Sequence, residues 1–395
     1  MRILWTVPYL PWPTTSGGKV RQYHLLRVLA ERGHRITLLV QSKTGLTPDV
    51  EAQLSPLLEQ LICLPRRPLK HPTTLCAALL SPQPLLATVN GLSPQLSQTF
   101  DKLLDQHWDI VQIEHTYAFQ PFMAALQRRQ RPFLLSEHNV ESRLSGATYG
   151  KLPSWLKPLA HYDRRRYQRW ERQVLGRARC VIAVTQDDAH ALQQISGQPT
   201  RVVINGVDTH GFSQVVPNAA SQRVLFVGNY DYAPNVDAVE WAVTEIFPIV
   251  WQTLPEVYFA VCGFALPERW RTTYTDPRIE WRGYIDSLPA MQNESALFLA
   301  PLRDGGGSKL KVLETLASSL PLVSTSQGVS GLAIDAYTHY LAGETAEALA
   351  AQIIFGMQNP AQCRVMGLAA RAAVGAAYDW HAAASQLEAI YHEFK

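Results

Sequence analysis

The sequence predicts an α/β protein built from two doubly wound, Rossmann-like domains. Short apolar runs, typical of strands that a sheet buries on both faces, alternate with segments of helical periodicity. This alternation occurs twice, before and after a polar stretch from Asn205 to Gln222 that is typical of a linker. The length of 395 residues fits two or three domains of about 150 residues each.

The first alternation starts with a strand at Ile3–Val7. The apolar residues of Lys19–Arg32 recur at helical spacing, and Gly33 is the expected stop of that helix. Ile36–Val40 is an uninterrupted apolar run and is predicted to be a buried strand. Further strands are expected at Leu61–Leu64, Ile110–Ile113, Phe133–Leu135, Val181–Val184 and Val202–Ile204.

The second alternation predicts strands at Val224–Val227, Val257–Val261, Ile279–Arg282, Leu297–Ala300 and Leu322–Ser324. Helices are expected at Val236–Trp251, from Ser308 onward and over most of 345–395. The expected organisation is therefore an N-terminal domain at 1–208, a C-terminal domain at 209–375 and a final helix at 376–395 that crosses back to the first domain. In such sheets ligands bind beyond the carboxyl ends of the strands, so we expect the site in a deep cleft between the two domains.

The composition is that of a globular protein, with 47% apolar and 17% charged residues, which excludes a largely disordered chain. The five cysteines form no Cys-x-x-Cys pair, which excludes a zinc ribbon or a disulfide framework and favours a reducing compartment. No apolar stretch reaches the length of about 20 residues that a membrane-spanning helix needs, and prolines interrupt the apolar N-terminus. A cytoplasmic protein is therefore expected.

Positive charge is concentrated in the first half of the chain. Residues 1–215 contain 25 Lys and Arg against 15 Asp and Glu, whereas residues 216–395 contain 11 against 18. Much of the excess lies in 151–179, where aromatic residues are interspersed among the arginines Arg164, Arg165, Arg166, Arg169, Arg172, Arg177 and Arg179. This region is predicted either to contact anionic lipid headgroups or a phosphorylated acceptor, or to be a solvated helix face. Nothing else in the sequence resembles a nucleic-acid-binding module.

A glycine-rich loop follows a predicted strand and opens a helix. It reads Asp304-Gly305-Gly306-Gly307-Ser308-Lys309-Leu310-Lys311 and leads into Glu314. Uncovered backbone N–H groups and the positive end of a helix dipole favour an anion there. Two lysines in a first helical turn are locally unfavourable unless an anion is bound, so the loop predicts a diphosphate site. Exposed lysines paired with Asp304 or Glu314 are the alternative.

Glu314 and a second glycine pair, Gly17-Gly18, complete the candidate nucleotide site. Glu314 lies six residues past Ser308, about 9 Å along a helix, which is too far for the phosphates but suitable for the hydroxyls of a ribose. Its alternative role is a helical pair with Lys311. Gly17-Gly18 opens the first predicted helix and is neither a P-loop nor a Gly-x-Gly-x-x-Gly fingerprint.

Taken in order, these motifs resemble glycosyltransferase family 4, whose members have the GT-B fold, retain anomeric configuration and need no metal. The resemblance extends over nearly the whole chain. Its motifs are Gly17-Gly18 with Arg21-Gln22-Tyr23-His24, Ser136-Glu137-His138-Asn139-Val140-Glu141, Asn205-Gly206-Val207-Asp208, Phe226-Val227-Gly228-Asn229, Gly305–Glu314 and Pro321-Leu322-Val323-Ser324-Thr325. Gly228–Asn235 together with Gly305–Lys311 is similar to a bacterial subgroup linked to exopolysaccharide assembly.

The resemblance implies roles for individual residues. Glu314 matches the second glutamate of the family's Glu-x7-Glu motif, which holds the donor ribose, whereas Gly306 occupies the position of the first. The family's arginine and lysine for the diphosphate would fall near Asn229 and Asn235, so we infer that Lys309, or as second choice Lys311, replaces that charge.

His138 matches the histidine beside the donor sugar, and His115 is the runner-up. Position alone leaves His138 open between a sugar contact and a capping or core role. The predicted catalytic residues are His138 and Lys309. The predicted donor-binding residues are Gly17, Gly18, Asn229, Gly305, Gly306, Gly307, Ser308, Lys311 and Glu314.

The expected function is therefore the transfer of a hexose from a nucleotide-diphosphate sugar to a carbohydrate or lipid-linked hydroxyl acceptor, in bacterial polysaccharide or glycolipid synthesis. No metal, no other cofactor and no nucleic acid partner is expected, and the protein is predicted to be cytoplasmic or peripheral at the inner membrane face. A nucleotide-sugar epimerase of the same fold and a non-catalytic nucleotide-sugar binder are the alternatives, the latter because of Gly306, Asn229 and Asn235.

Overall fold

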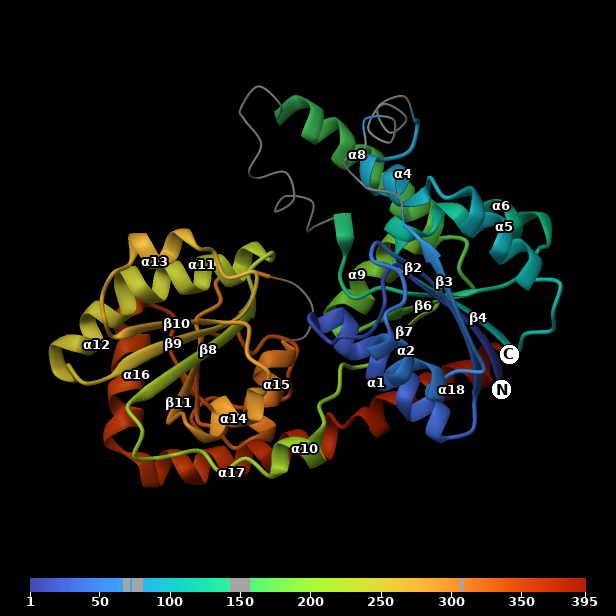
Figure 1. Ribbon diagram of the computed structural model, residues 1–395. Helices are drawn as coiled ribbons and strands as arrows, with labels where there is room; N and C mark the ends of the chain where they lie inside the picture. Colours follow the sequence, from blue (N-terminus) through green and yellow to red (C-terminus); the bar gives the residue numbers. More distant parts are fainter. Residues whose placement is uncertain (67–71, 73–80, 143–156, 306–308) are drawn as a thin grey trace. The chain divides into compact units, whose positions relative to one another are not determined.

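The computed structural model describes residues 1–66, 72, 81–142, 157–305 and 309–395 (Figure 1). The chain forms two compact units. The first comprises Met1–Ile204 together with Ala383–Lys395, and the second comprises Asn205–Ala382. Each unit contains one parallel sheet with helices between its strands, which confirms the predicted class of two α/β domains.

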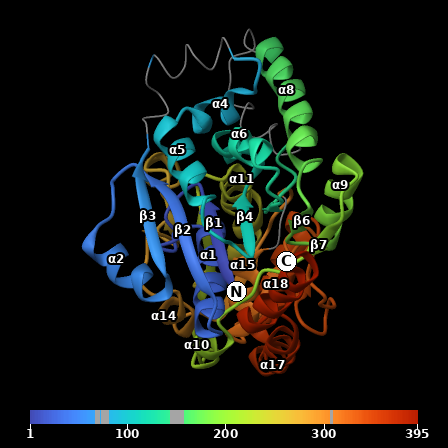
Figure 2. The same cartoon turned by 90° about the vertical axis from the view of Figure 1, so that its right-hand side faces the viewer.

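The first unit contains a seven-stranded sheet in the order β3-β2-β1-β4-β5-β6-β7, and all of its strand pairs are parallel (Figure 2). Its strands are β1 (Arg2–Val7), β2 (Arg35–Ser42), β3 (Gln60–Pro65), β4 (Ile110–Glu114), β5 (Leu134–Ser136), β6 (Cys180–Ala183) and β7 (Thr200–Val202). The last strand lies two residues earlier than the predicted Val202–Ile204. The apolar run continues one residue past it, where the Val203 amide still donates to the Ala183 carbonyl at the end of β6.

The described helices of this unit are α1 (Gly17–Glu31), α2 (Pro48–Leu54), α4 (Leu85–Gly91), α5 (Pro94–Leu103), α6 (Gln120–Arg128), α8 (Lys157–Leu175), α9 (Gln186–Ser196) and α18 (Trp380–Phe394). Phe100 of α5, Phe122 of α6 and Val174 of α8 share one buried cluster with the inward residues Leu4 and Val111 of the sheet. Burial of this apolar surface is the main force that holds the helices on the strands.

The second unit contains a six-stranded parallel sheet in the order β10-β9-β8-β11-β12-β13. Its strands are β8 (Arg223–Asn229), β9 (Tyr258–Phe264), β10 (Ile279–Gly283), β11 (Leu297–Ala300), β12 (Leu322–Ser324) and β13 (Leu341–Ala342). Its helices include α10 (Thr209–Ser213), α11 (Ala233–Trp241), α12 (Phe247–Thr253), α13 (Arg269–Thr273), α14 (Leu288–Asn293), α15 (Leu310–Ala317), α16 (Ala346–Gln358) and α17 (Pro360–Ala377). The core of this unit joins Phe226, Val261 and Leu299 of the sheet to Ile246 and Leu349.

The helix predicted at Val236–Trp251 is interrupted. It consists of α11, a π-helical segment at Ala242–Ile246 and α12. Pro248 explains the change, because it lacks an amide hydrogen and its ring crowds the carbonyl four residues earlier. The wider π turn just before Pro248 accommodates that ring without ending the helix.

Among the described residues, none of the helices combines the length and the apolar character that a bilayer-spanning segment requires.

Candidate functional site

The predicted site residues fall into two groups, one in each unit. The first unit holds Gly17, Gly18 and His138, and the second holds Asn229, Gly305, Lys309, Lys311 and Glu314. Gly306, Gly307 and Ser308, which the sequence also assigns to donor binding, lie outside the described residues.

In the first unit, the glycine pair and His138 lie together at the carboxyl edge of the sheet. His138 follows β5, and Gly17 and Gly18 are the first residues of α1. A Cβ atom on Gly18 would lie 2.4 Å from the Tyr9 hydroxyl and 3.3 Å from His138 Nδ1. The start of α1 passes against these two side chains, so a larger residue at Gly18 would force one of them to move. Gly17 is exposed.

Glu114, the last residue of β4, fixes the orientation of the His138 ring. Its Oε2 lies 3.0 Å from His138 Nε2. Burial opposes the charge on Glu114, but the hydrogen bond with His138 and the neighbouring His115 outweigh it and lower its pKa to about 2. Burial lowers the pKa of His138 to about 4. At neutral pH a carboxylate therefore accepts the Nε2 hydrogen of a neutral imidazole, which leaves Nδ1 as an acceptor beside Gly18.

A chain of buried hydrogen bonds holds Glu114 in turn. Its Oε1 accepts from Trp5 Nε1 and from Gln112 Nε2, each at 2.8 Å. Gln112 Oε1 accepts from the Tyr391 hydroxyl of α18 at 2.5 Å. The sequence analysis missed these residues. A signal was present, because Gln112 and Glu114 are polar residues two positions apart in an otherwise apolar strand and therefore share one face.

His115, the second candidate histidine, packs against His138. Its ring stacks on Tyr117 with centroids 4.8 Å apart and meets the His138 ring edge-on at 4.3 Å. Its backbone has a φ of 66°, a left-handed conformation that is strained for a residue other than glycine. Burial lowers the pKa of His115 to about 4. The geometry makes it a neutral support for the His138 ring.

Two glutamates, Glu137 and Glu141, lie next to His115. Glu137 lies with its Oε2 3.5 Å from His115 Nδ1, and burial together with the charge of Glu171 raises its pKa. Two sets in the described part of the chain have potential metal-ligand atoms within 4.8 Å of one another, Glu114 with His115 and His138, and His115 with Glu137 and Glu141. In the first set the oxygens of Glu114 are already taken up by hydrogen bonds.

In the second unit, Gly305 connects the loops that follow three adjacent strands. Its φ is 120°, and a Cβ atom there would lie 2.8 Å from the Tyr232 hydroxyl, so the position requires glycine. Its carbonyl oxygen accepts from Lys309 Nζ at 2.7 Å and from Gln327 Nε2 at 2.6 Å. The sequence analysis missed Gln327, which lies in the loop after β12.

Lys309 precedes the helix that it was predicted to join. The helix from Ser308 was wrong by two residues, because α15 begins at Leu310 and Lys309 is its N-cap residue with non-helical backbone angles. The Lys309 side chain folds back to the Gly305 carbonyl, and the residue is only 7% exposed. A buried ammonium group thus lies beside the glycine-rich loop.

Lys311, which is half-buried, supplies a second ammonium group at the same edge. Its Nζ donates to Asn235 Oδ1 at 2.5 Å and lies 4.4 Å from the centre of the Phe226 ring. Asn235 Nδ2 in turn donates to the Asn229 carbonyl at the end of β8. Burial, with the neighbouring charge of Lys309, lowers the pKa of Lys311 to about 7. Lys311 thus places its ammonium group directly beside Asn235.

Glu314 follows Lys311 by nearly one turn of α15 and is half-buried. Burial raises its pKa to about 7, and Lys311 opposes this shift. The two oxygens of this carboxyl group can each accept a hydrogen bond from one hydroxyl of a vicinal diol.

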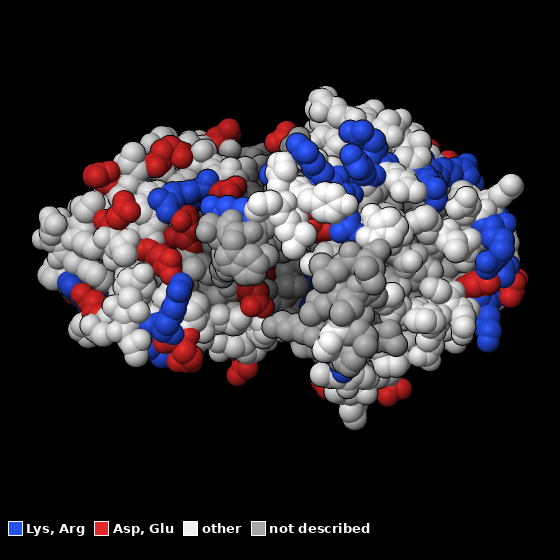
Figure 3. Space-filling model, turned by 90° about the horizontal axis from the view of Figure 1, so that it is seen from above, with Lys and Arg blue, Asp and Glu red and all other residues white. Residues whose placement is uncertain are grey.

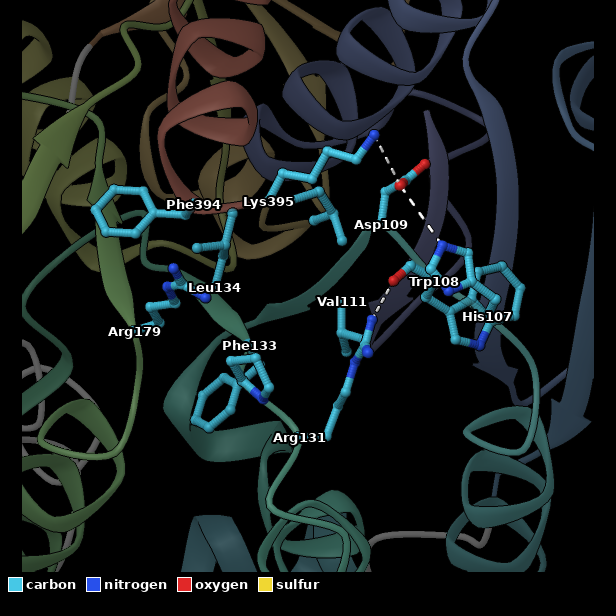
Figure 4. Close-up of a pocket in the computed structure, with 12 residues that line it drawn as sticks. His107, Trp108, Asp109, Val111, Arg131, Phe133, Leu134, Arg179, Phe394 and Lys395 are labelled. Carbon is cyan, nitrogen blue, oxygen red and sulfur yellow. Dashed lines mark hydrogen bonds and ion pairs between the residues drawn. The ribbon is translucent and has the colours of Figure 1, made fainter.

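A separate cavity of about 230 Å³ lies at the opposite, amino edge of the first sheet (Figure 4). It contains basic residues, but these have partners. An Arg131 Nη atom donates to the Trp108 carbonyl, and Lys395 Nζ lies 3.0 Å from Asp109. Another cavity, of about 400 Å³, lies in the second unit and is lined mainly by apolar residues such as Val216, Met357 and Leu368. Neither is lined by the predicted site residues.

Two family models match the chain in succession. Residues 15–210 match the family described as "Glycosyltransferase Family 4", and residues 221–359 match "Glycosyl transferases group 1". A curated relative from Klebsiella pneumoniae, described as an uncharacterized 44.6 kDa protein in the cps region, is 20% identical over 331 residues, which cover 81% of this chain and 82% of the relative.

Solved structures with the same fold are distant in sequence. Sucrose-phosphate synthase from Thermosynechococcus elongatus has a TM-score of 0.74 at 19% identity and covers 100% of this chain and 98% of its own. Anabaena HepE, solved in complex with UDP and glucose, has a TM-score of 0.68 at 14% identity and covers 100% of both chains. These neighbours are GT-B glycosyltransferases, and the structural similarity shows that this chain has the GT-B fold. The two family matches, which together extend from residue 15 to residue 359, establish that this chain belongs to glycosyltransferase family 4 and is a glycosyltransferase.

Proposed function

We propose that this protein transfers a hexosyl group from a nucleotide-diphosphate sugar to an acceptor hydroxyl with retention of anomeric configuration, in the cytoplasmic assembly of a bacterial polysaccharide or glycolipid. The observation that carries the proposal is the pair of lysine ammonium groups, those of the buried Lys309 and the half-buried Lys311, beside the glycine-rich loop of the second unit. HepE, the Anabaena neighbour, has also been solved in complex with UDP-glucose. We therefore take a UDP-sugar as the first donor to test.

The proposed catalysis stabilises the leaving diphosphate electrostatically. Lys309 and Lys311 lie where the charge of the departing group increases, and fixed charges in a site of low dielectric act more strongly than in water. Asn235 and Gly305 hold the two ammonium groups in place before the donor binds. Because the chain provides this charge itself, we propose that no metal ion is needed.

His138 is proposed to act on the donor sugar. A neutral imidazole with Nε2–H bound to Glu114 presents the Nδ1 lone pair, which accepts a hydrogen bond from a sugar hydroxyl. Such a contact orients the sugar while the bond to the diphosphate breaks. The acceptor oxygen then bonds to the anomeric carbon from the face that the leaving group vacates, and the acceptor proton passes to the departing diphosphate oxygen. Attack from this face retains the anomeric configuration.

The test combines binding and turnover. Thermal unfolding is measured with UDP, GDP and ADP and with their glucose conjugates, because a ligand that binds the native state raises the midpoint. Turnover is then followed as release of the nucleotide in EDTA, with octyl glycosides and a polyprenyl lipid extract as acceptors, and the anomeric configuration of the product is read by NMR. Epimerised sugar from donor alone would indicate an epimerase, and donor binding without turnover would indicate a binding protein.

Donor binding is expected to weaken as the pH rises. The pKa of Lys311 is lowered to about 7, so its ammonium group is charged below that value and neutral above it. The diphosphate of UDP-glucose stays fully ionised across this range. The dissociation constant of UDP-glucose, measured by calorimetry, should therefore rise about tenfold from pH 6 to pH 8. Lys311→Met should remove the part of this dependence that comes from Lys311 and leave the part that comes from Glu314, whose pKa is also about 7. Lys309→Met should move the Lys311 part to higher pH, because the charge of Lys309 depresses the pKa of Lys311.

Gly18→Ala is expected to lower turnover about 10- to 100-fold with little change in thermal stability, since small displacements of a catalytic group have large effects on rate. The added methyl group would lie 2.4 Å from the Tyr9 hydroxyl and 3.3 Å from His138 Nδ1, so one of these side chains must move. Gly375→Ala is the matched control, because no atom lies within 4 Å of a Cβ there. Equal turnover in the two variants would contradict the placement of His138.

A further inference from the structure

The exposed face of α8 carries positive charge that the protein does not neutralise. Its exposed basic residues are Lys157, Arg164, Arg165, Arg169 and Arg172. None of their side chains makes a hydrogen bond or an ion pair with the described part of the chain. The basic side chains gather on this helix in Figure 3.

The two acidic residues of α8 point inward and are occupied. Asp163 is 5% exposed, binds Arg166 and accepts the amide of Leu85 at the start of α4. Glu171 is 1% exposed and accepts the amide of Ser142. The residues outside the described ranges contain no Asp or Glu in their sequence and include Arg67, Lys70, Arg143 and Lys151. No acidic residue of those segments can therefore balance the charge on α8.

The start of α8 adds apolar surface to this charge. Leu159 is 49% exposed and Tyr162 is 59% exposed. The opposite face of the helix is anchored in the core through Tyr167, Trp170 and Val174. The helix is thus fixed to the unit and presents arginines, one tyrosine and one leucine to the outside. Basic residues mixed with interfacial aromatic and aliphatic side chains are typical of a surface that rests on a membrane.

The topology places the start of this face near the edge that carries His138. β5 and β6 are parallel neighbours, so the connection between them must return from the carboxyl edge to the amino edge of the sheet. α8 forms the second part of that connection, and its first turns, which begin at Lys157, lie toward the carboxyl edge (Figures 1 and 2). A flat anionic surface that contacts α8 would therefore lie on the same side of this unit as His138.

We propose that the exposed face of α8 docks the protein on a bilayer that contains anionic phospholipid, without insertion of a spanning segment. Each basic residue close to such a surface adds roughly a fivefold gain in partitioning, so five together are sufficient for reversible binding that salt weakens. A nucleic-acid site usually contacts phosphates along a groove, whereas the described face is a single convex helix, and this favours a bilayer. This proposal concerns a partner and does not depend on the assignment of the reaction.

The experiment is co-sedimentation with vesicles. The full chain should bind vesicles of equal parts phosphatidylglycerol and phosphatidylcholine and should dissociate from them at high salt. It should not bind vesicles of pure phosphatidylcholine. The variant Arg164→Gln, Arg165→Gln, Arg169→Gln should lose roughly 100-fold in partitioning while it retains UDP binding. The control Lys43→Gln, Lys102→Gln, Arg364→Gln has the same change of net charge at exposed sites elsewhere and should bind as the wild type does.

Three outcomes would overturn the proposal. The first is that the wild type fails to bind the anionic vesicles at low salt. The second is that the α8 variant binds them as tightly as the control variant. In the third, a short single-stranded RNA competes the protein off the vesicles and itself binds through the same three arginines, which would assign the face to nucleic acid. Since none of these readouts uses turnover, failure here is distinguishable from failure of the proposed glycosyl transfer.

Discussion

Simultaneous replacement of Lys309 and Lys311 with methionine is expected to lower kcat by about three orders of magnitude with the fold intact, as loss of preorganised charge at a leaving group usually does. Both ammonium groups lie at the carboxyl edge of the second sheet, one on the Gly305 carbonyl and one on Asn235. Methionine keeps most of the aliphatic stem, so the change removes the charge, including the Lys311 ammonium group over the Phe226 ring, and little packing.

The single variants separate the two cations. Lys309 is bound to the loop itself, whereas Lys311 is held by the element that follows β8, so their effects need not be equal. The control is Lys43→Met with Lys102→Met, two exposed lysines of the first unit. Turnover of the double variant at the wild-type rate, with the control unchanged, would refute the assignment of the diphosphate site.

Glu114→Gln is expected to lower kcat at least about 100-fold and to leave the KM of the donor nearly unchanged, since fixing a histidine in the wrong tautomer has effects of up to about 10⁴-fold elsewhere. Two N–H groups, from Trp5 and Gln112, donate to Oε1 of Glu114. In the variant the amide oxygen must stay at that position, so the amide nitrogen faces His138 Nε2. His138 then carries its hydrogen on Nδ1 and can no longer accept there.

The tautomer itself can be measured. Nitrogen-15 NMR of histidine-labelled protein should show Nε2–H at His138 in the wild type and Nδ1–H in the variant. A merely structural role of Glu114 would lower the unfolding midpoint and leave the tautomer as it is. Glu51→Gln, at an exposed glutamate of α2, is the control and should change neither.

The sequence predicted most strands because buried parallel strands are continuous apolar runs, and β1, β2, β8 and β11 are of this kind. It failed where local pattern does not decide. β13 has two residues, which is too short to give a periodic signal, and it exists because β12 offers it an edge. The start of α15 was misplaced because the side chain of Lys309 bonds to Gly305 rather than entering the first turn.

The candidate site shows the same division. Glycines and charged residues after strands could be found from the sequence, because strand ends at one edge of a sheet are where ligands bind. Their partners could not. Glu114 lies 24 positions before His138, and only the pairing of β4 with β5, in which Glu114 faces Ser136, brings the two together. The approach of Lys311 to Asn235, 76 positions apart, is likewise a product of the neighbouring strands β8 and β11.

The contact of Tyr391 with Gln112 has a consequence for protein engineering. α18 belongs mostly to the first unit although the chain reaches it only after leaving the second. A chimera that exchanges everything after residue 204 for the corresponding part of another glycosyltransferase would replace α18 with a foreign helix. The native His138 would then lose the support that Tyr391 gives it through Gln112 and Glu114. Recombination of donor specificities should therefore use two junctions, at 204 and at 383, so that each graft keeps its own tyrosine with its own histidine.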